Sequence, residues 1–196
     1  MVFENLVSKV IKDKKLVQPV AFALTIFTVY GSWKVIYYFL NAPGSAIHSQ
    51  WVHFTNWFAY VHLVVTGKIC SLLGFDVTYK LPDIFYLNHS RGVVIAEHCL
   101  AVPALYVFTF SVVFFPGGWQ NKWWFLLVGI AGIFLINITR LVLIGITLLY
   151  APASTFLFFH SFFYVLITYS LIFLLFAWWI NRFMLRQDES VDAKTV

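Results

Sequence analysis

The strongest constraint on the fold is the segment 123–150, in which Arg140 is the only charged residue. A helix needs a stretch of about 20 apolar residues to cross a hydrocarbon core of about 30 Å. Residues 19–40 and 155–180 are largely apolar runs of similar length. Of all 196 residues, 61% are hydrophobic and 11% are charged, and a soluble domain of this size could not bury so much apolar surface. The sequence therefore predicts an integral membrane protein.

The predicted fold class is an all-α polytopic membrane protein with about four to five transmembrane helices, an amphipathic helix and a small extracytoplasmic β-hairpin-like element. We expect one membrane domain over residues 1–196. Its predicted segments are a basic juxtamembrane helix (1–18), a first crossing (19–40), an amphipathic or membrane helix (46–75), a strand-and-turn element (76–98), a three-helix region (99–180) and a cytoplasmic tail (181–196). The three helices are expected at 100–115, 123–150 and 155–180.

Two segments depart from the pattern of a simple crossing. In 46–75, apolar residues such as Trp51, Phe54 and Phe58 recur at spacings of three and four, with polar residues largely between them. This pattern favours a helix in the membrane interface or shallowly embedded, and a full crossing remains the alternative. In 76–98, short β-rich runs are separated by turn residues. Because strand backbone cannot face lipid, we expect this element to lie outside the hydrocarbon.

The distribution of lysine and arginine predicts the orientation. With four crossings and residues 46–99 outside, eight basic residues lie inside and three lie outside. The inner set is Lys9, Lys12, Lys14, Lys15, Lys122, Arg182, Arg186 and Lys194, and the outer set is Lys68, Lys80 and Arg91. Loops inside the cell carry the excess of positive charge, so both termini are expected inside.

Three chemically capable side chains are expected at one depth. Arg140 lies 17 residues after Trp123 and His160 lies 18 residues before Trp178, which correspond to about 25 Å and about 27 Å of helix at 1.5 Å per residue. Cys99 lies 16 residues before the end of its helix, or about 24 Å. All three therefore reach a similar depth near one membrane face.

These residue types suit a cysteine acyl-transfer site. A helix N-terminus at Cys99 and the Arg140 cation would both lower the pKa of the thiol and favour the nucleophilic thiolate. His160 could take the thiol proton and later protonate a leaving amine, and Arg140 could donate to an oxyanion. The alternatives are a buried cysteine that acts as a small hydrophobe, a satisfied histidine, and an arginine that snorkels or ties helices together with Asn137.

Other function classes have less support in the sequence. The two cysteines form no CxxC motif, so a disulfide relay is not expected. Haem or metal binding through His48, His53, His62 and His98 is a further alternative, but no HExxH motif or paired helical spacing supports it. We expect no metal and no cofactor. The net charge of +5 is explained by residues beside a lipid membrane, so nucleic acid is not an expected partner.

The same positions carry a resemblance to a known family. Glu97-His98-Cys99 before an apolar helix, then Asn137-Ile138-Thr139-Arg140, then Phe159-His160 before the last crossing, resemble the exosortase/archaeosortase family. The similarity covers roughly residues 45–182 and is best over 93–180. Where many members follow the cysteine with Ser or Asn and then Gly, this chain has Leu100-Ala101.

The resemblance implies a membrane cysteine protease or transpeptidase. Its substrates would be exported proteins whose C-terminal sorting signal has a short motif, a transmembrane helix and a basic cluster. Cys99 would be the nucleophile, Arg140 the oxyanion-side cation and His160 the acid/base, supported by Asn137, Glu97 and His98. The protein would be multi-pass in the plasma (inner) membrane with its site on the extracytoplasmic side. The alternative is a catalytically inactive scaffold or assembly subunit, because the residues after Cys99 depart from the family pattern.

Overall fold

The computed structural model describes residues 14–89, 92–114 and 119–179. The predicted tail at 181–196 and most of the predicted basic helix at 1–18 lie outside these residues. The helices of the described chain are α2 (Lys14–Leu40), α3 (Ala46–Leu72), a 3₁₀ turn η1 (Glu97–Cys99), α4 (Val102–Phe114), α5 (Trp119–Tyr150), α6 (Ala153–Phe158), a π-helical turn η2 (Phe159–Phe163) and α7 (Tyr164–Trp179). The strands are β1 (Val77–Lys80), β2 (Ile84–Leu87) and β3 (Val93–Val94).

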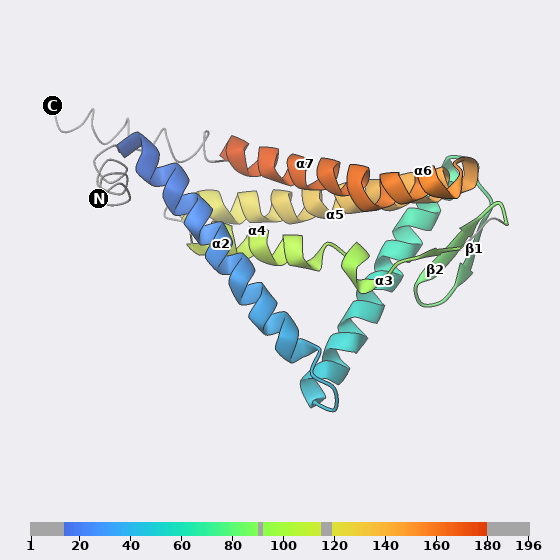
Figure 1. Cartoon of the computed structure of the whole chain (residues 1–196), viewed down its shortest axis with the longest axis horizontal. Coiled ribbons are helices and arrows are strands. Elements are labelled where there is room, and N and C mark those ends of the chain that lie inside the picture. The colour runs from blue at the N-terminus through green and yellow to red at the C-terminus, as the bar shows by residue number, and fades with distance from the viewer. Residues whose placement is uncertain (1–13, 90–91, 115–118, 180–196) are drawn as a thin grey trace.

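The helices form two groups (Figure 1). α4, α5 and α7 run side by side, with the sheet near the end of α5 that leads into α6. α2 and α3 form a V whose point is the connection at 41–45, and α2 packs against α4 while α3 packs against α5. Ser45 begins α3 as an N-cap, because its side-chain oxygen accepts from the backbone N–H of His48 at 3.0 Å.

One helix in the described part of the chain is both long and apolar enough to cross a bilayer. It is Lys122–Tyr150, which has 29 residues and contains an 18-residue window with a mean hydropathy of 2.3. Val102–Phe114 and Tyr164–Trp178 are shorter apolar helices. The chain is thus mostly helical, as predicted.

Several predicted boundaries need correction. α2 begins at Lys14 and runs through Pro19, so the end of the predicted basic helix and the first crossing are one helix. α5 begins at Trp119, before the predicted start at 123. The last predicted crossing is divided into α6, η2 and α7.

The three strands form one antiparallel sheet in the order β1-β2-β3. Val77 pairs with Leu87 and Lys80 with Ile84, while Phe85 pairs with Val93. β2 alternates between buried and partly buried residues, as a strand with one packed face does. Its buried Phe85 and Leu87 reach α5 at Gly145, where a Cβ would lie 2.9 Å from Leu87 Cδ1. The glycine therefore allows the sheet to pack directly on α5.

Two hydrophobic clusters hold these elements together. The bundle cluster joins α4, α5 and α7 and contains Ala104, Phe108, Val112, Phe125, Leu126, Ile133, Ile172 and Phe176. The site-end cluster joins α3, the sheet, η1, α5 and α7 and contains Ala59, Leu63, Cys70, Phe85, Leu87, Val93, Ile95, Cys99, Leu100, Leu141, Val142, Ile144 and Tyr164. The predicted nucleophile is thus part of a packed core.

Candidate active site

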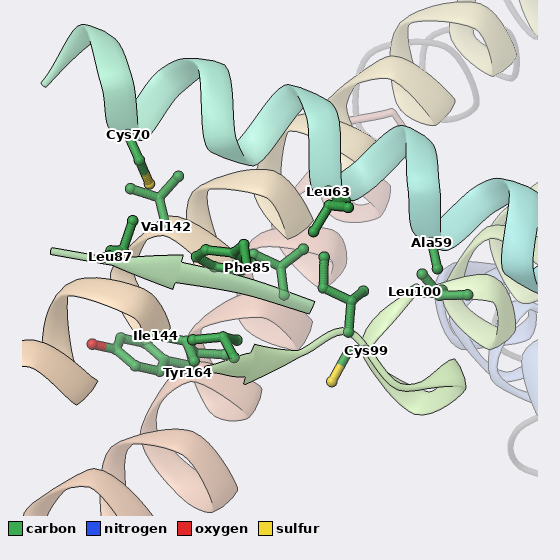
Figure 2. Close-up of a cluster of buried hydrophobic side chains, with 13 residues drawn as sticks. Ala59, Leu63, Cys70, Phe85, Leu87, Cys99, Leu100, Val142, Ile144 and Tyr164 are labelled. Atoms are coloured by element: carbon green, nitrogen blue, oxygen red, sulfur yellow. The ribbon is translucent and has the colours of Figure 1, made fainter. Parts of the chain in front are cut away.

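Cys99 is the last residue of the 3₁₀ turn η1, between β3 and α4. Its backbone N–H donates to the Ala96 carbonyl at 2.7 Å, which closes the turn. The side chain is 3% exposed. Figure 2 shows its sulfur pointing away from Ala59 and Leu63 on α3, whose side chains lie on the other side of the cluster. The thiol is therefore buried but directed away from the apolar face of α3.

Arg140 on α5 is the cation of this region. It is partly buried, and its charge acts on both the Cys99 thiol and the His160 ring. Its Nε–H is buried and has no hydrogen-bond acceptor among the described residues. A buried donor without an acceptor needs an explanation, and a catalytic role is one. The structure thus places Arg140 within electrostatic reach of both of the other residues that the spacing argument placed at one depth.

His160 lies in the π-helical turn η2. Its ring is partly buried and stacks on Phe156 with centroids 5.6 Å apart. His98 is exposed and close enough for its charge to act on His160. Short π-helical segments within α-helices occur frequently at functional sites, because the wider turn redirects the side chains. The π-helical turn that interrupts the last predicted helix therefore contains its candidate catalytic residue, His160.

The prediction of a lowered thiol pKa at Cys99 is wrong for the free protein. Burial raises the pKa of Cys99, and the Arg140 charge and the bond to Ala96 oppose this only in part. The expected helix N-terminus is also displaced, because α4 begins at Val102 and Cys99 lies before it in the 3₁₀ turn. The thiol is thus largely protonated near neutral pH and needs a base to become a nucleophile.

Glu97 opens the same turn and connects it to α2 and α3. Its Oε1 accepts a hydrogen bond from Trp51 Nε1 at 3.0 Å, and its carboxylate also interacts with the Tyr37 hydroxyl through a side-chain hydrogen bond. Trp51 is on α3 and Tyr37 is on α2. The Glu97 carboxylate therefore connects α2 and α3 to the turn that ends at Cys99.

Asn137 on α5 contacts the main chain of the same turn. Its Nδ2 donates to the Cys99 carbonyl oxygen at 2.7 Å, and its side chain is fully buried. Asn137 and Arg140 are three residues apart on α5, so they share a helix face. The Asn-x-x-Arg spacing therefore lets Asn137 bond to the main chain of Cys99 while the charge of Arg140 acts on the Cys99 thiol.

The backbone conformation at Ala101 bears on the Leu100-Ala101 sequence that follows the cysteine. Ala101 has a φ of +55°, a left-handed conformation that glycine adopts freely and that costs other residues about 1 kcal/mol. The resemblance implies that many members of the family have glycine at this position. Ala101 thus retains the backbone geometry that would favour glycine there.

Four residues near the site were not identified from the sequence. Trp51 and Tyr37 hold Glu97, as described. Tyr164 is buried one turn after His160, and its hydroxyl shares a hydrogen bond with that of Thr147, which ties α7 to α5. These pairs are separated by 17 to 60 residues, as the numbering shows, so no local motif could have indicated them.

The other histidines do not form a metal centre in the described residues. No group of three or more His, Cys, Asp and Glu side chains there could hold a metal ion. His62 is buried between Phe58 and Phe134, with its Nδ1 2.8 Å from the Phe58 carbonyl oxygen. His48 Nδ1 lies 3.0 Å from the Leu40 carbonyl oxygen. Both therefore have structural contacts of their own.

An apolar groove lies away from these residues. It measures about 370 Å³ between α2, α4 and α7, and its lining includes Ile26, Phe108 and Phe176 but none of the predicted site residues. We locate the candidate site at residues 97–101, which we name the Cys99 turn, because the thiol lies there and the Arg140 charge acts on it.

The fold is that of a helical protein with a helix able to cross a membrane, and its candidate site has an arginine whose charge acts on both a cysteine and a histidine. A sequence model described as transmembrane exosortase (Exosortase_EpsH) matches residues 14–178. The chain therefore belongs to the transmembrane exosortase family, as the resemblance predicted. Neither a curated protein nor a solved structure matches it. Membership indicates a membrane transpeptidase or protease.

Proposed function

We propose that this chain is a membrane-embedded cysteine protease or transpeptidase that cleaves C-terminal sorting signals of exported proteins. The observation that carries the proposal is the position of Arg140, whose charge acts on both the Cys99 thiol and His160. A nucleophile, a base and a fixed donor are the components that acyl transfer requires. Family membership supports the same reaction class.

The proposed reaction has two steps. His160 accepts the Cys99 proton, and the thiolate attacks the scissile carbonyl while the Arg140 Nε–H donates to the oxyanion. The C–N bond breaks, the amine leaves with the proton from His160, and an acyl thioester remains on Cys99. Water or an amine then attacks the thioester, and the thiol regains its proton. Because the free thiol is protonated, the role of His160 as a base is essential.

The proposed topology has α2, α4, α5 and α7 as crossings of the plasma (inner) membrane in a single membrane domain. α3 would be a fifth, amphipathic helix at or near the outer surface, and the sheet would lie outside. The support is the excess of eight basic residues over three on the inner side. The site is then extracytoplasmic.

The proposed partners are membrane lipid and substrate proteins that end in a short motif, a transmembrane helix and a basic cluster. A basic cluster remains on the inner side for the same reason as the basic residues of this chain. The substrate helix then crosses outward and presents its motif at the depth of Cys99. The substrate class and this topology therefore agree.

A second candidate is a catalytically inactive scaffold of the same family. The observation in its favour is the thiol itself, which is 3% exposed and has a raised pKa. A labelled thiol without turnover would support this candidate.

Cys99→Ala tests the proposal. Processing of a co-expressed substrate of this class should fall to background with the variant at near-normal abundance, and Cys99→Ser should recover little, because a hydroxyl is a poorer nucleophile at neutral pH. Cys70→Ala is the matched control, since Cys70 is a buried cysteine of the same cluster. Undiminished processing by Cys99→Ala would remove Cys99 from the mechanism.

Single cysteines test the topology in a chain that lacks Cys70 and Cys99. Lys80→Cys on exposed β1 should react with a membrane-impermeant maleimide in intact cells. Trp123→Cys, which replaces an exposed side chain near the start of α5, should react only after the inner face is opened. The reverse pattern would invert the proposed orientation.

A further inference from the structure

The Cys99 turn has a backbone that requires support. Leu100 has an αR conformation and donates its N–H to the Glu97 carbonyl at 3.1 Å. Ala101 then reverses the sign of φ to +55° before α4 begins at Val102. A residue with a Cβ keeps such a conformation only where its surroundings impose it. Some other part of the fold must therefore hold the turn.

The Asn137 carboxamide provides a contact of this kind. It donates to the Cys99 carbonyl from a helix 38 positions further along the chain. The bond is short, at 2.7 Å, and is buried on both sides. A buried carbonyl that lost this donor would pay the cost of desolvation without compensation. The bond therefore favours one placement of the turn on α5.

Arg140 depends on that placement. It projects from the same face of α5 as Asn137, and its charge acts on the Cys99 thiol. α5 thus holds the main chain of Cys99 through Asn137. Three residues later it carries Arg140, whose charge acts on the Cys99 thiol. A displacement of the turn would change the separation between the sulfur and the guanidinium.

We propose that Asn137 is a positioning residue, which holds the Cys99 turn on α5 and thereby keeps the sulfur within electrostatic reach of the Arg140 guanidinium. This inference deepens the proposed function and rests on it for its meaning in turnover. Asn137 touches neither substrate nor reacting atoms in this role. Its effect is on the interaction between two other residues, and that interaction can be measured without a substrate.

The experiment is a double-mutant cycle on thiol reactivity in a Cys70→Ala chain. The alkylation rate of Cys99 with iodoacetamide is measured against pH in detergent, with and without Arg140→Ala. Around the turn, the other titratable groups are Glu97 and His98 on the turn itself, Tyr37 on α2, and His160 and Tyr164 on η2 and α7, and all remain unchanged throughout. The displacement of the pH midpoint by Arg140→Ala reports how strongly the guanidinium acts on the thiol.

The cycle is then repeated in Asn137→Leu, which removes the donor without adding charge. We expect the displacement caused by Arg140→Ala to fall to less than half of its value in the parent chain. Thr139→Val is the matched control, because it removes an exposed side-chain bond to the Leu135 carbonyl on the same helix and touches no site residue. That background should retain the full displacement.

A second variant covers the case in which Asn137→Leu does not fold. Asn137→Gln keeps the carboxamide and moves it outward by one methylene, so the displacement should be reduced there as well. A full displacement in whichever variant folds would overturn the inference. This outcome would leave the proposed function intact. Undiminished processing by Cys99→Ala would instead remove the proposed function, and the alkylation results for chains that keep Cys99 would still stand.

Discussion

The bundle cluster and the site-end cluster differ in how their buried polar side chains are paired. Beside the bundle cluster, Thr168 donates to the Tyr164 carbonyl within α7, and Lys122 donates to Val113 at the adjacent helix end. At the site end, Asn137 bonds to Cys99 across 38 positions and Trp51 bonds to Glu97 across 46. The bonds beside the bundle cluster lie within one helix or join the ends of two consecutive helices, whereas those at the site end join elements far apart in the sequence and so specify their relative placement.

The bundle depends instead on close apolar packing. Gly129 of α5 faces the ring of Phe108 on α4, which no larger residue at that position would permit. Phe108 also packs against Phe125 and Phe176, with ring centroids 5.3 and 5.0 Å away. Small residues that let helices approach are typical of packing within membranes. The bundle therefore provides support, and the site end provides the chemical geometry.

The largest expected effects separate the two clusters through a matched pair of fully buried phenylalanines. Phe85→Ala and Phe108→Ala should each cost about 3–5 kcal/mol of stability, because both leave a cavity. Phe85→Ala should also lower turnover per folded molecule, because Phe85 and Cys99 belong to the same cluster. Phe108→Ala should not, because Phe108 belongs to the bundle cluster. Thermal unfolding and processing by the purified proteins check both results. Equal turnover by the two variants would contradict the division into support and site.

The next effect concerns the geometry of a cation. Arg140→Lys keeps the charge but replaces a planar group that has fixed donors with a flexible ammonium. Loss of an oxyanion donor typically lowers the rate by about 10²–10³, and we expect a loss of this size with little change in stability. Single-turnover processing is the measurement.

Lys122→Met is the control for Arg140→Lys at the other end of the molecule. Lys122 is a buried cation near the bundle cluster, and its Nζ donates to the Val113 carbonyl at 3.0 Å. Lys122→Met should lower the melting temperature and leave turnover per folded molecule nearly unchanged. A nearly wild-type rate for Arg140→Lys would assign Arg140 a structural role like that of Lys122.

A smaller effect is expected in the pH dependence of Cys99 alkylation. A thiol ionises as the pH rises through its pKa, and burial raises the pKa of Cys99. The profile should therefore be centred above that of glutathione, the exposed reference. Arg140 lowers the pKa of Cys99, so Arg140→Ala should move the midpoint further upward. A midpoint below the reference would restore the prediction made from the sequence.

The smallest effect is a gain in stability at Ala101. Glycine adopts a φ of +55° without the steric cost of a Cβ, so Ala101→Gly should stabilise the protein by up to about 1 kcal/mol. Ala131→Gly, at an exposed position within α5, should have the opposite sign and a similar size. Melting temperatures of the two variants check the prediction. Destabilisation by both would show that Ala101 is not under strain.

Much of the architecture follows from the sequence. Long apolar runs with one charge identify membrane helices because lipid requires every backbone group to be satisfied within the helix. Turn residues and β-rich runs predict short strands at 77–81, 84–87 and 93–96, and the structure has strands at 77–80, 84–87 and 93–94. The depth argument also selected Cys99, Arg140 and His160, since helical rise converts residue number directly into distance. These inferences are local, and they need no knowledge of which elements touch.

Only the tertiary structure decided the environment of those residues. The pKa of Cys99 depends on burial by α3, the sheet and α5, and this burial outweighs the Arg140 charge that the sequence could indicate. The contacts of Glu97 with Trp51 and of Asn137 with Cys99 depend on how distant elements pack. The left-handed backbone at Ala101 is likewise imposed from outside, because alanine has no local preference for it. Spacing along one helix sets depth, but solvation, hydrogen bonding and strain are set by neighbours that are remote in the sequence.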